Sequence, residues 1–158
     1  MADTDQRIAK ITLDERSVVR RNADIEHERA VAIFDLLEEN SFSLVAPADG
    51  PFHLHLGIED NRLVFDIRAT DEAPIERLLL PISPFRSIVK DYFFVCESYF
   101  QAIKTASPSR IEAIDMGRRA LHNEGSELLR QRLAERVAVD LGTARRLFTL
   151  LCVLHIRA

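Results

Sequence analysis

Alternating apolar and polar residues predict a β-hairpin in the first half of the chain. Large apolar residues occupy every second position in 52–58 and again in 63–67, a spacing typical of strands with one buried face. The Asp-Asn pair at 60–61 suits a two-residue turn. That turn would place His55 opposite Asp66 and gather nearly all the large apolar side chains on one face.

Three further runs predict strands around this hairpin. Residues 7–13 read RIAKITL and predict an N-terminal strand, whereas 42–46 are a weaker candidate. Residues 75–82 lie between two prolines, which favours a third strand that extends the hairpin into an antiparallel meander.

The remaining segments repeat their apolar residues at the spacing of a helix. Two Ser-Pro pairs, at 83–84 and 107–108, supply an N-cap serine followed by proline at the first helical position. The Gly-Ser pair at 125–126 predicts a break between helices, and Asp24 and Asp140 are suitable N-caps. The expected helices cover 24–40, 84–104, 108–124, 126–136 and 141–158.

These elements predict an α+β fold, in which an antiparallel β-meander with an additional N-terminal strand packs against about five helices. A chain of 158 residues is long enough to bury one sizeable core. Since no repeat or low-complexity linker divides it, we expect a single globular domain covering residues 1–158.

Composition narrows the class of protein. Hydrophobic residues make up 47% and charged residues 29%, as in soluble globular chains, and the net charge of −4 argues against nucleic-acid binding. The start, MADTDQR, lacks signal-peptide features, and the apolar run at 147–156 is too short for a membrane span. Cys96 and Cys152 lie in apolar patterns without CxxC spacing, so we expect buried reduced thiols. The expected location is the cytoplasm, without membrane association.

The most informative polar residues are charged or titratable side chains that lean toward apolar helix faces. Buried charge is costly unless it is paired, so these side chains should meet one another or a ligand. The predicted ligand-binding centre consists of Glu26, Arg29, Arg118, Glu124, Arg145 and His155. A structural ion-pair network is the favoured interpretation. A pocket for a small anion comes second, because arginines outnumber acids in the set, and catalysis comes third.

His53 and His55 share one face of the predicted hairpin, a spacing that can chelate a metal ion. Asp66 could supply a third ligand. An ordinary solvated sheet face is nevertheless the favoured interpretation, because Arg68 is the expected neighbour of His53 and would repel a cation. We therefore expect no metal and no cofactor.

Two helix surfaces carry further expectations. Phe94 falls among polar positions, where it would be exposed, covered by another element or held in an intermolecular contact. On the helix at 108–124, His122 is expected to point outward. A stripe of small residues on the same helix would permit close approach of another helix; it consists of Ala113, Gly117 and Ala120.

Five segments carry a family resemblance: EHERAVAIFDLLEENSF at 26–42, LVFDIR at 63–68, SPFRSIVKDYF at 83–93, SPSRIEAIDMGRRALHNEG at 107–125 and TARRLFTLLCVLH at 143–155. They resemble an uncharacterised family of small bacterial proteins without an assigned activity. The resemblance spans nearly the whole chain and implies a bacterial cytoplasmic protein with one domain. It implies no catalytic residue, cofactor or partner.

We expect a cytoplasmic binding or regulatory domain that recognises a protein or a small anionic ligand. The alternative is a small hydrolase or transferase that uses Arg118, Glu26 and His155. Enzymatic activity is the less favoured class, because the sequence has no nucleophile elbow, triad order or Gly-rich phosphate loop. Nucleic-acid association through the arginines at 118–119 and 145–146 is a weaker third alternative, and a homo-oligomer is compatible with each.

Overall fold

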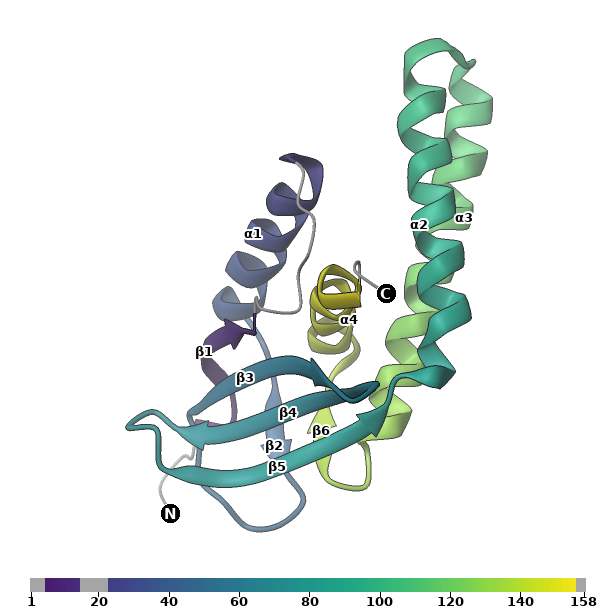
Figure 1. Ribbon diagram of the computed structural model, residues 1–158. Coiled ribbons are helices and arrows are strands. Elements are labelled where there is room, and N and C mark those ends of the chain that lie inside the picture. Colours follow the sequence, from purple (N-terminus) through teal and green to yellow (C-terminus); the bar gives the residue numbers. More distant parts are fainter. Residues whose placement is uncertain (1–4, 15–22, 156–158) are drawn as a thin grey trace.

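The protein has the predicted α+β architecture (Figure 1). The computed structural model describes residues 5–14 and 23–155, and among side chains those of 5–14 and 26–154. In this part of the chain, four strands form one sheet, two form a second, and four helices accompany them. The elements are β1 (Ile8–Leu13), α1 (Ala23–Glu38), β2 (Phe42–Leu44), β3 (Phe52–Glu59), β4 (Arg62–Ala69), β5 (Pro74–Pro81), α2 (Ser83–Thr105), α3 (Pro108–Leu133), β6 (Val137–Val139) and α4 (Leu141–His155).

Strands β3, β4 and β5 form the predicted antiparallel meander. His55 pairs with Asp66, so the predicted hairpin register is confirmed. Asp60 (φ 51°) and Asn61 (φ 61°) both adopt left-handed backbone conformations, as a two-residue turn of this kind requires. Asp and Asn tolerate that conformation better than most residues, because their short polar side chains form local hydrogen bonds.

The additional N-terminal strand β1 lies at the edge of this sheet and runs parallel to β3. Asn40, which follows α1, holds the strand in place. Its Oδ1 accepts a hydrogen bond from Ile8 N at 2.7 Å, and its Nδ2 donates to Ile8 O at 3.0 Å. Nδ2 also donates to Leu36 O at 2.7 Å. One amide side chain therefore connects the last turn of α1 to the first strand.

The strand candidate at 42–46 is present as β2, but the second sheet that it forms with β6 is not apparent in the sequence pattern. In it β2 pairs antiparallel with β6, a three-residue strand that lies between two helices and is too short to show a periodicity. The adjacent Ser41 amide donates to Thr143 Oγ1 at 2.9 Å. These contacts fix the segment before the meander against the beginning of α4.

Helices α2 and α3 form a long antiparallel hairpin that projects from the sheet (Figure 1). Both begin at the predicted Ser-Pro pairs. Ser107 is the N-cap of α3, and its Oγ accepts a hydrogen bond from Arg110 N at 3.4 Å. Ser83 is instead the first residue of α2 and makes no side-chain cap hydrogen bond.

The predicted break at Gly125 and Ser126 is wrong, because α3 continues through both residues to Leu133. The described residues therefore contain four helices, fewer than expected. Packing explains the glycine, since a Cβ at Gly125 would overlap the ring of Phe148 on α4. Ser126 Oγ donates to the carbonyl oxygen of His122 at 2.7 Å, which satisfies the hydroxyl inside the helix.

The surface of the projecting hairpin differs in part from expectation. Phe94 is 72% exposed, so no described element covers it. The small-residue stripe is also exposed rather than packed against a helix of the described chain, and nothing lies within 4 Å of a Cβ built at Gly117. Arg118 faces α2 instead, with its guanidinium carbon 4.8 Å from the centre of the Tyr99 ring.

Helix α4 lies at the centre of the hydrophobic core. Leu147, Phe148, Leu150 and Leu151 are each at most 1% exposed, and the helix packs against both α1 and α3 (Figure 1). Both cysteines are buried and free, as predicted. None of the described helices combines the length and the apolar character needed to cross a membrane.

The two glycines of α3 offer a matched pair of substitutions. Gly117→Ala should stabilise the protein by about 0.5 to 1 kcal/mol, because alanine favours a helix and its methyl group meets nothing. Gly125→Ala should destabilise it by about 1 to 2 kcal/mol, because displacement of Phe148 outweighs the same gain in helix propensity. Urea denaturation followed by circular dichroism measures both effects. Equal effects would contradict the packing of α3 on α4.

Candidate functional site

The members of the predicted polar centre whose side chains the structure describes do not all line one cleft. Glu26 and Arg29 form a pair on α1, with 3.8 Å between Oε1 and Nη1. Arg118 pairs with Asp115 on its own helix, with 2.6 Å between Nη2 and Oδ1. The inward position of Arg118 is therefore satisfied locally, by a carboxylate one turn away and by the Tyr99 ring.

The other three predicted residues have different positions. Glu124 is exposed on α3. The side chain of His155 lies outside the described residues. Arg145, in contrast to the other predicted residues with described side chains, lines a cleft.

This cleft lies between α1 and α4 and has a volume of about 420 Å³. Side chains from three helices contribute charged and polar groups to it: Glu28 and Asp35 of α1, His122 of α3, and Arg145, Arg146 and Thr149 of α4. The exposed His27 of α1 also borders it. The cleft therefore has acidic groups on α1 and basic groups near the beginning of α4.

His122 was predicted to point outward, and that prediction is wrong. Its ring packs against Tyr92 and Phe148, with centroid distances of 5.4 Å and 5.2 Å. Its Nε2 lies 2.8 Å from Thr149 Oγ1. Because the Thr149 hydroxyl donates to Arg145 O at 3.2 Å, its oxygen accepts a hydrogen bond from the imidazole Nε2–H.

The environment favours the neutral form of this imidazole. Burial, followed by the positive charges of Arg145 and Arg118, lowers the pKa of His122 from 6.5 to about 4. A buried imidazolium would lose its hydration and face two cations. The positive charge of Arg145 is therefore close enough to His122 to disfavour its protonation.

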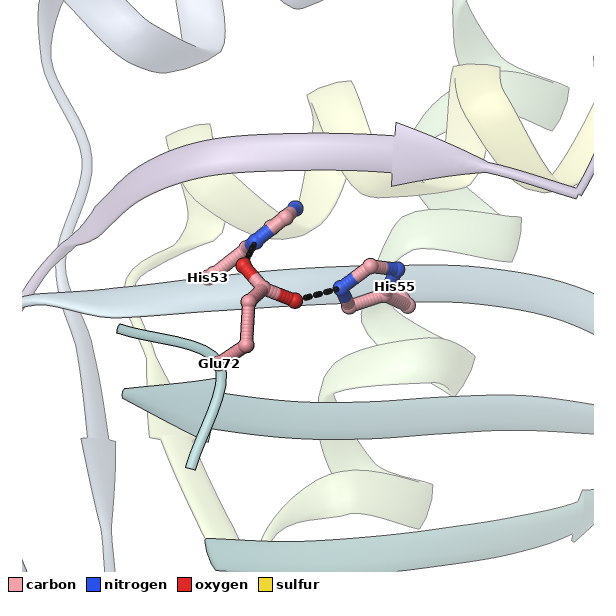
Figure 2. A group of neighbouring side chains, drawn as sticks. All are labelled: His53, His55 and Glu72. Atoms are coloured by element: carbon pink, nitrogen blue, oxygen red, sulfur yellow. Dashed lines mark hydrogen bonds and ion pairs between the residues drawn. The ribbon is translucent and has the colours of Figure 1, made fainter. Parts of the chain in front are cut away.

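A second polar cluster lies on β3 (Figure 2). His53, expected on a solvated face, is only 3% exposed. Its Nδ1 contacts Glu72 Oε2, and His55 Nε2 lies 3.0 Å from Glu72 Oε1. The two imidazole centroids are 3.9 Å apart. Glu72 belongs to the turn between β4 and β5, where it has a φ of 75°, and its carboxylate reaches over both rings.

Charged neighbours complete this cluster. Hydrogen bonds from His53 and then from His55 lower the pKa of Glu72 to about 2, so its carboxylate is ionised at neutral pH. Arg68 Nη1 donates to Glu72 Oε1 at 3.3 Å, and Arg68 Nη2 donates to Asp66 Oδ2 at 2.8 Å. Asp66, considered as a third ligand from sequence, thus binds Arg68, and Glu72 is the carboxylate between the histidines.

Sequence reasoning missed Glu72 and misjudged His122 for different reasons. The hairpin register identifies neighbours across β3 and β4, but a turn residue has no register partner. The register irregularity between Ile67 and Arg68, at the end that adjoins this turn, is visible only in the structure, so the sequence pattern gives no signal for Glu72. His122 showed no signal either, since its burial depends on the position of α4.

The comparisons with known proteins identify a family but no activity. A family model described as an uncharacterised protein family, UPF0262, matches residues 5–157, and the chain belongs to this family. The family has no assigned activity. No solved structure matches the chain.

The relatives are bacterial and similar over nearly their full length. A UPF0262 protein of Paramagnetospirillum magneticum is 62% identical over 152 residues, which cover 96% of this chain and 97% of the relative. One from Rhodopseudomonas palustris is 59% identical over 153 residues, covering 97% and 94%. One from Azorhizobium caulinodans is 59% identical over 151 residues, covering 94% and 93%.

The half-buried His122 predicts a specific dependence of stability on pH. The unfolded chain protonates this residue as the pH falls through 6.5, whereas the folded chain resists protonation until about pH 4. Proton binding therefore favours the unfolded state, and acidification through this window should lower stability by up to about 1.4 kcal/mol per pH unit. His122→Asn should reduce the difference between urea midpoints measured at about pH 7 and about pH 5.

The exposed His27 provides the control for this measurement. His27→Gln should leave the difference between the two midpoints unchanged. If His122→Asn folds and retains the full wild-type difference, then burial of His122 does not cause it.

Proposed function

We propose that this protein is a cytoplasmic binding protein, and that its ligand is a small anionic molecule held in the cleft between α1 and α4. The cleft volume of about 420 Å³ is in the range of small-molecule sites in proteins. A molecule of that size, rather than an extended protein surface, fits such a cleft. Cytoplasmic location is part of the proposal and is supported by the two free cysteines, which suit a reducing compartment.

The observation that carries the proposal is the position of Arg145 and Arg146. Both line the cleft close to the beginning of α4, where the helix dipole is positive and makes the position unfavourable for cations. A bound anion would interact favourably with the two guanidinium groups and with the helix dipole at once. The lowered pKa of His122 is consistent with this, because Arg145 contributes to it.

The acidic residues on the α1 side of the cleft indicate that the ligand also carries hydrogen-bond donors. Glu28 and Asp35 line it, and carboxylates accept hydrogen bonds from hydroxyl, amino or ammonium groups. A simple inorganic anion offers these carboxylates no hydrogen-bond donor. We therefore propose an organic carboxylate or phosphate that also carries an amino or hydroxyl group.

Thermal stability in the presence of defined anions tests this proposal. Citrate, L-glutamate and glycerol 3-phosphate are suitable probes, and a ligand that binds the folded state raises the melting temperature as its concentration increases. We expect at least one of them to stabilise the wild type. Arg145→Gln or Arg146→Gln should weaken its affinity at least about tenfold, as for a lost charged hydrogen bond, and so reduce the shift in melting temperature at a given concentration.

Arg119→Gln is the matched control, because it removes one positive charge from an exposed position on α3 outside the cleft. It should preserve the response to the anion. Equal losses in all three variants would indicate a general charge effect and contradict a site at the cleft. A chemical shift change at His122, measured by NMR on addition of the anion, would locate the binding directly.

A further inference from the structure

The cluster on β3 has the donor atoms of a metal site. One nitrogen of His53, one nitrogen of His55 and a carboxylate oxygen of Glu72 all lie within 4.8 Å of one another. Ligand bonds to zinc are about 2.0 to 2.2 Å long, so neighbouring ligand atoms around one ion are roughly 3 to 3.5 Å apart. His55 Nε2 and Glu72 Oε1 are already 3.0 Å apart. The exposed Glu72 carboxylate would have to move away from His53 Nδ1, with which it is in direct contact, to admit an ion.

The orientation of His53 supports this assignment. Its ring is almost fully buried, and Nε2 lies 2.8 Å from Thr12 Oγ1 on the neighbouring strand β1. A histidine that ligates a metal generally donates its other N–H to a fixed oxygen, which holds the ring and its tautomer. If Nε2–H donates to Thr12, the lone pair of Nδ1 points at the Glu72 carboxylate. In that tautomer Nδ1 is available to a metal ion, whereas in the other tautomer Nδ1–H donates the hydrogen bond to Glu72 Oε2.

We propose that His53, His55 and Glu72 bind a divalent transition-metal ion of the zinc class. Two imidazoles and one carboxylate suit zinc and its first-row neighbours, whereas magnesium and calcium prefer oxygen ligands alone. This site lies on the meander and is independent of the anion cleft between α1 and α4.

The nearby arginine does not prevent cation binding. Arg68 donates to both Asp66 and Glu72, so its charge is compensated by two carboxylates. Carboxylates that ligate a metal are commonly hydrogen-bonded by a second residue, which fixes their orientation. Arg68 thus has the position of a residue that orients Glu72 toward the two histidines.

Three protein ligands leave a fourth coordination position for water or a small ligand. His55 borders a groove with a volume of about 320 Å³, which Thr12, Asp66 and Arg68 also line. The metal centre would therefore be accessible from this groove, which Thr12 of β1 also borders.

Isothermal titration of the untagged, metal-free protein with zinc chloride tests the proposal. We expect one zinc ion to bind per chain, and Glu72→Gln and His55→Gln each to weaken the affinity at least about tenfold. Both substitutions avoid the buried His53, and circular dichroism checks that each variant folds. In the wild type, NMR signals of His53 and His55 should shift on zinc addition, whereas that of His27 should not.

Two matched controls separate this site from general cation binding. Glu59→Gln removes the same charge from the same strand, where Glu59 pairs with Arg77, and His27→Gln removes a histidine elsewhere. Both should retain the wild-type affinity, and magnesium chloride should not compete. The proposal is overturned if the wild type binds no stoichiometric zinc, if folded Glu72→Gln and His55→Gln bind it as tightly as the wild type, or if zinc shifts His27 alone.

Discussion

The burial of α4 is the constraint on which the rest of the structure depends. This helix is apolar around most of its circumference, and burial of one large apolar side chain contributes about 1.5 to 3 kcal/mol. It must therefore be covered by other elements, and α1 and α3 provide part of that cover. The close approach of α3 is possible because Gly125 leaves room for the ring of Phe148. The same approach partly buries His122, and polar side chains of three helices line one cleft beside it.

The two faces of the four-stranded sheet carry different side chains: one face is apolar and packs into the core, and the other is polar. Leu54, Phe65 and Ile67 point into the core, where they are at most 1% exposed. The opposite face holds the cluster of His53, His55 and Glu72. On this face, Thr12 of the neighbouring strand β1 and Glu72 of the β4–β5 turn contact the His53 ring, which is buried among these hydrogen-bonding groups.

Charge pairs within single helices account for several of the charged residues that the sequence places toward apolar helix faces. Arg118 with Asp115, and Arg29 with Glu26, are neighbours one turn apart. Pairs of this kind contribute at most about 1 kcal/mol when partly exposed, so they accommodate the charges without determining the fold. Arg145 and Arg118 both place positive charge near His122, but of these two arginines Arg145 alone lines the cleft. Its position there, beside residues of other helices, is what makes it informative.

The sequence by itself determined the local structure, including the hairpin register, because a slip of one residue would turn the apolar face to solvent. The helix starts near Pro84 and Pro108 follow from backbone geometry alone. Only the tertiary structure decided that β2 meets β6, that Gly125 packs rather than ends a helix, and that Glu72 lies between two histidines. These features depend on contacts between residues distant in the chain, and neither periodicity nor capping chemistry encodes such contacts, since both act over a few neighbouring residues.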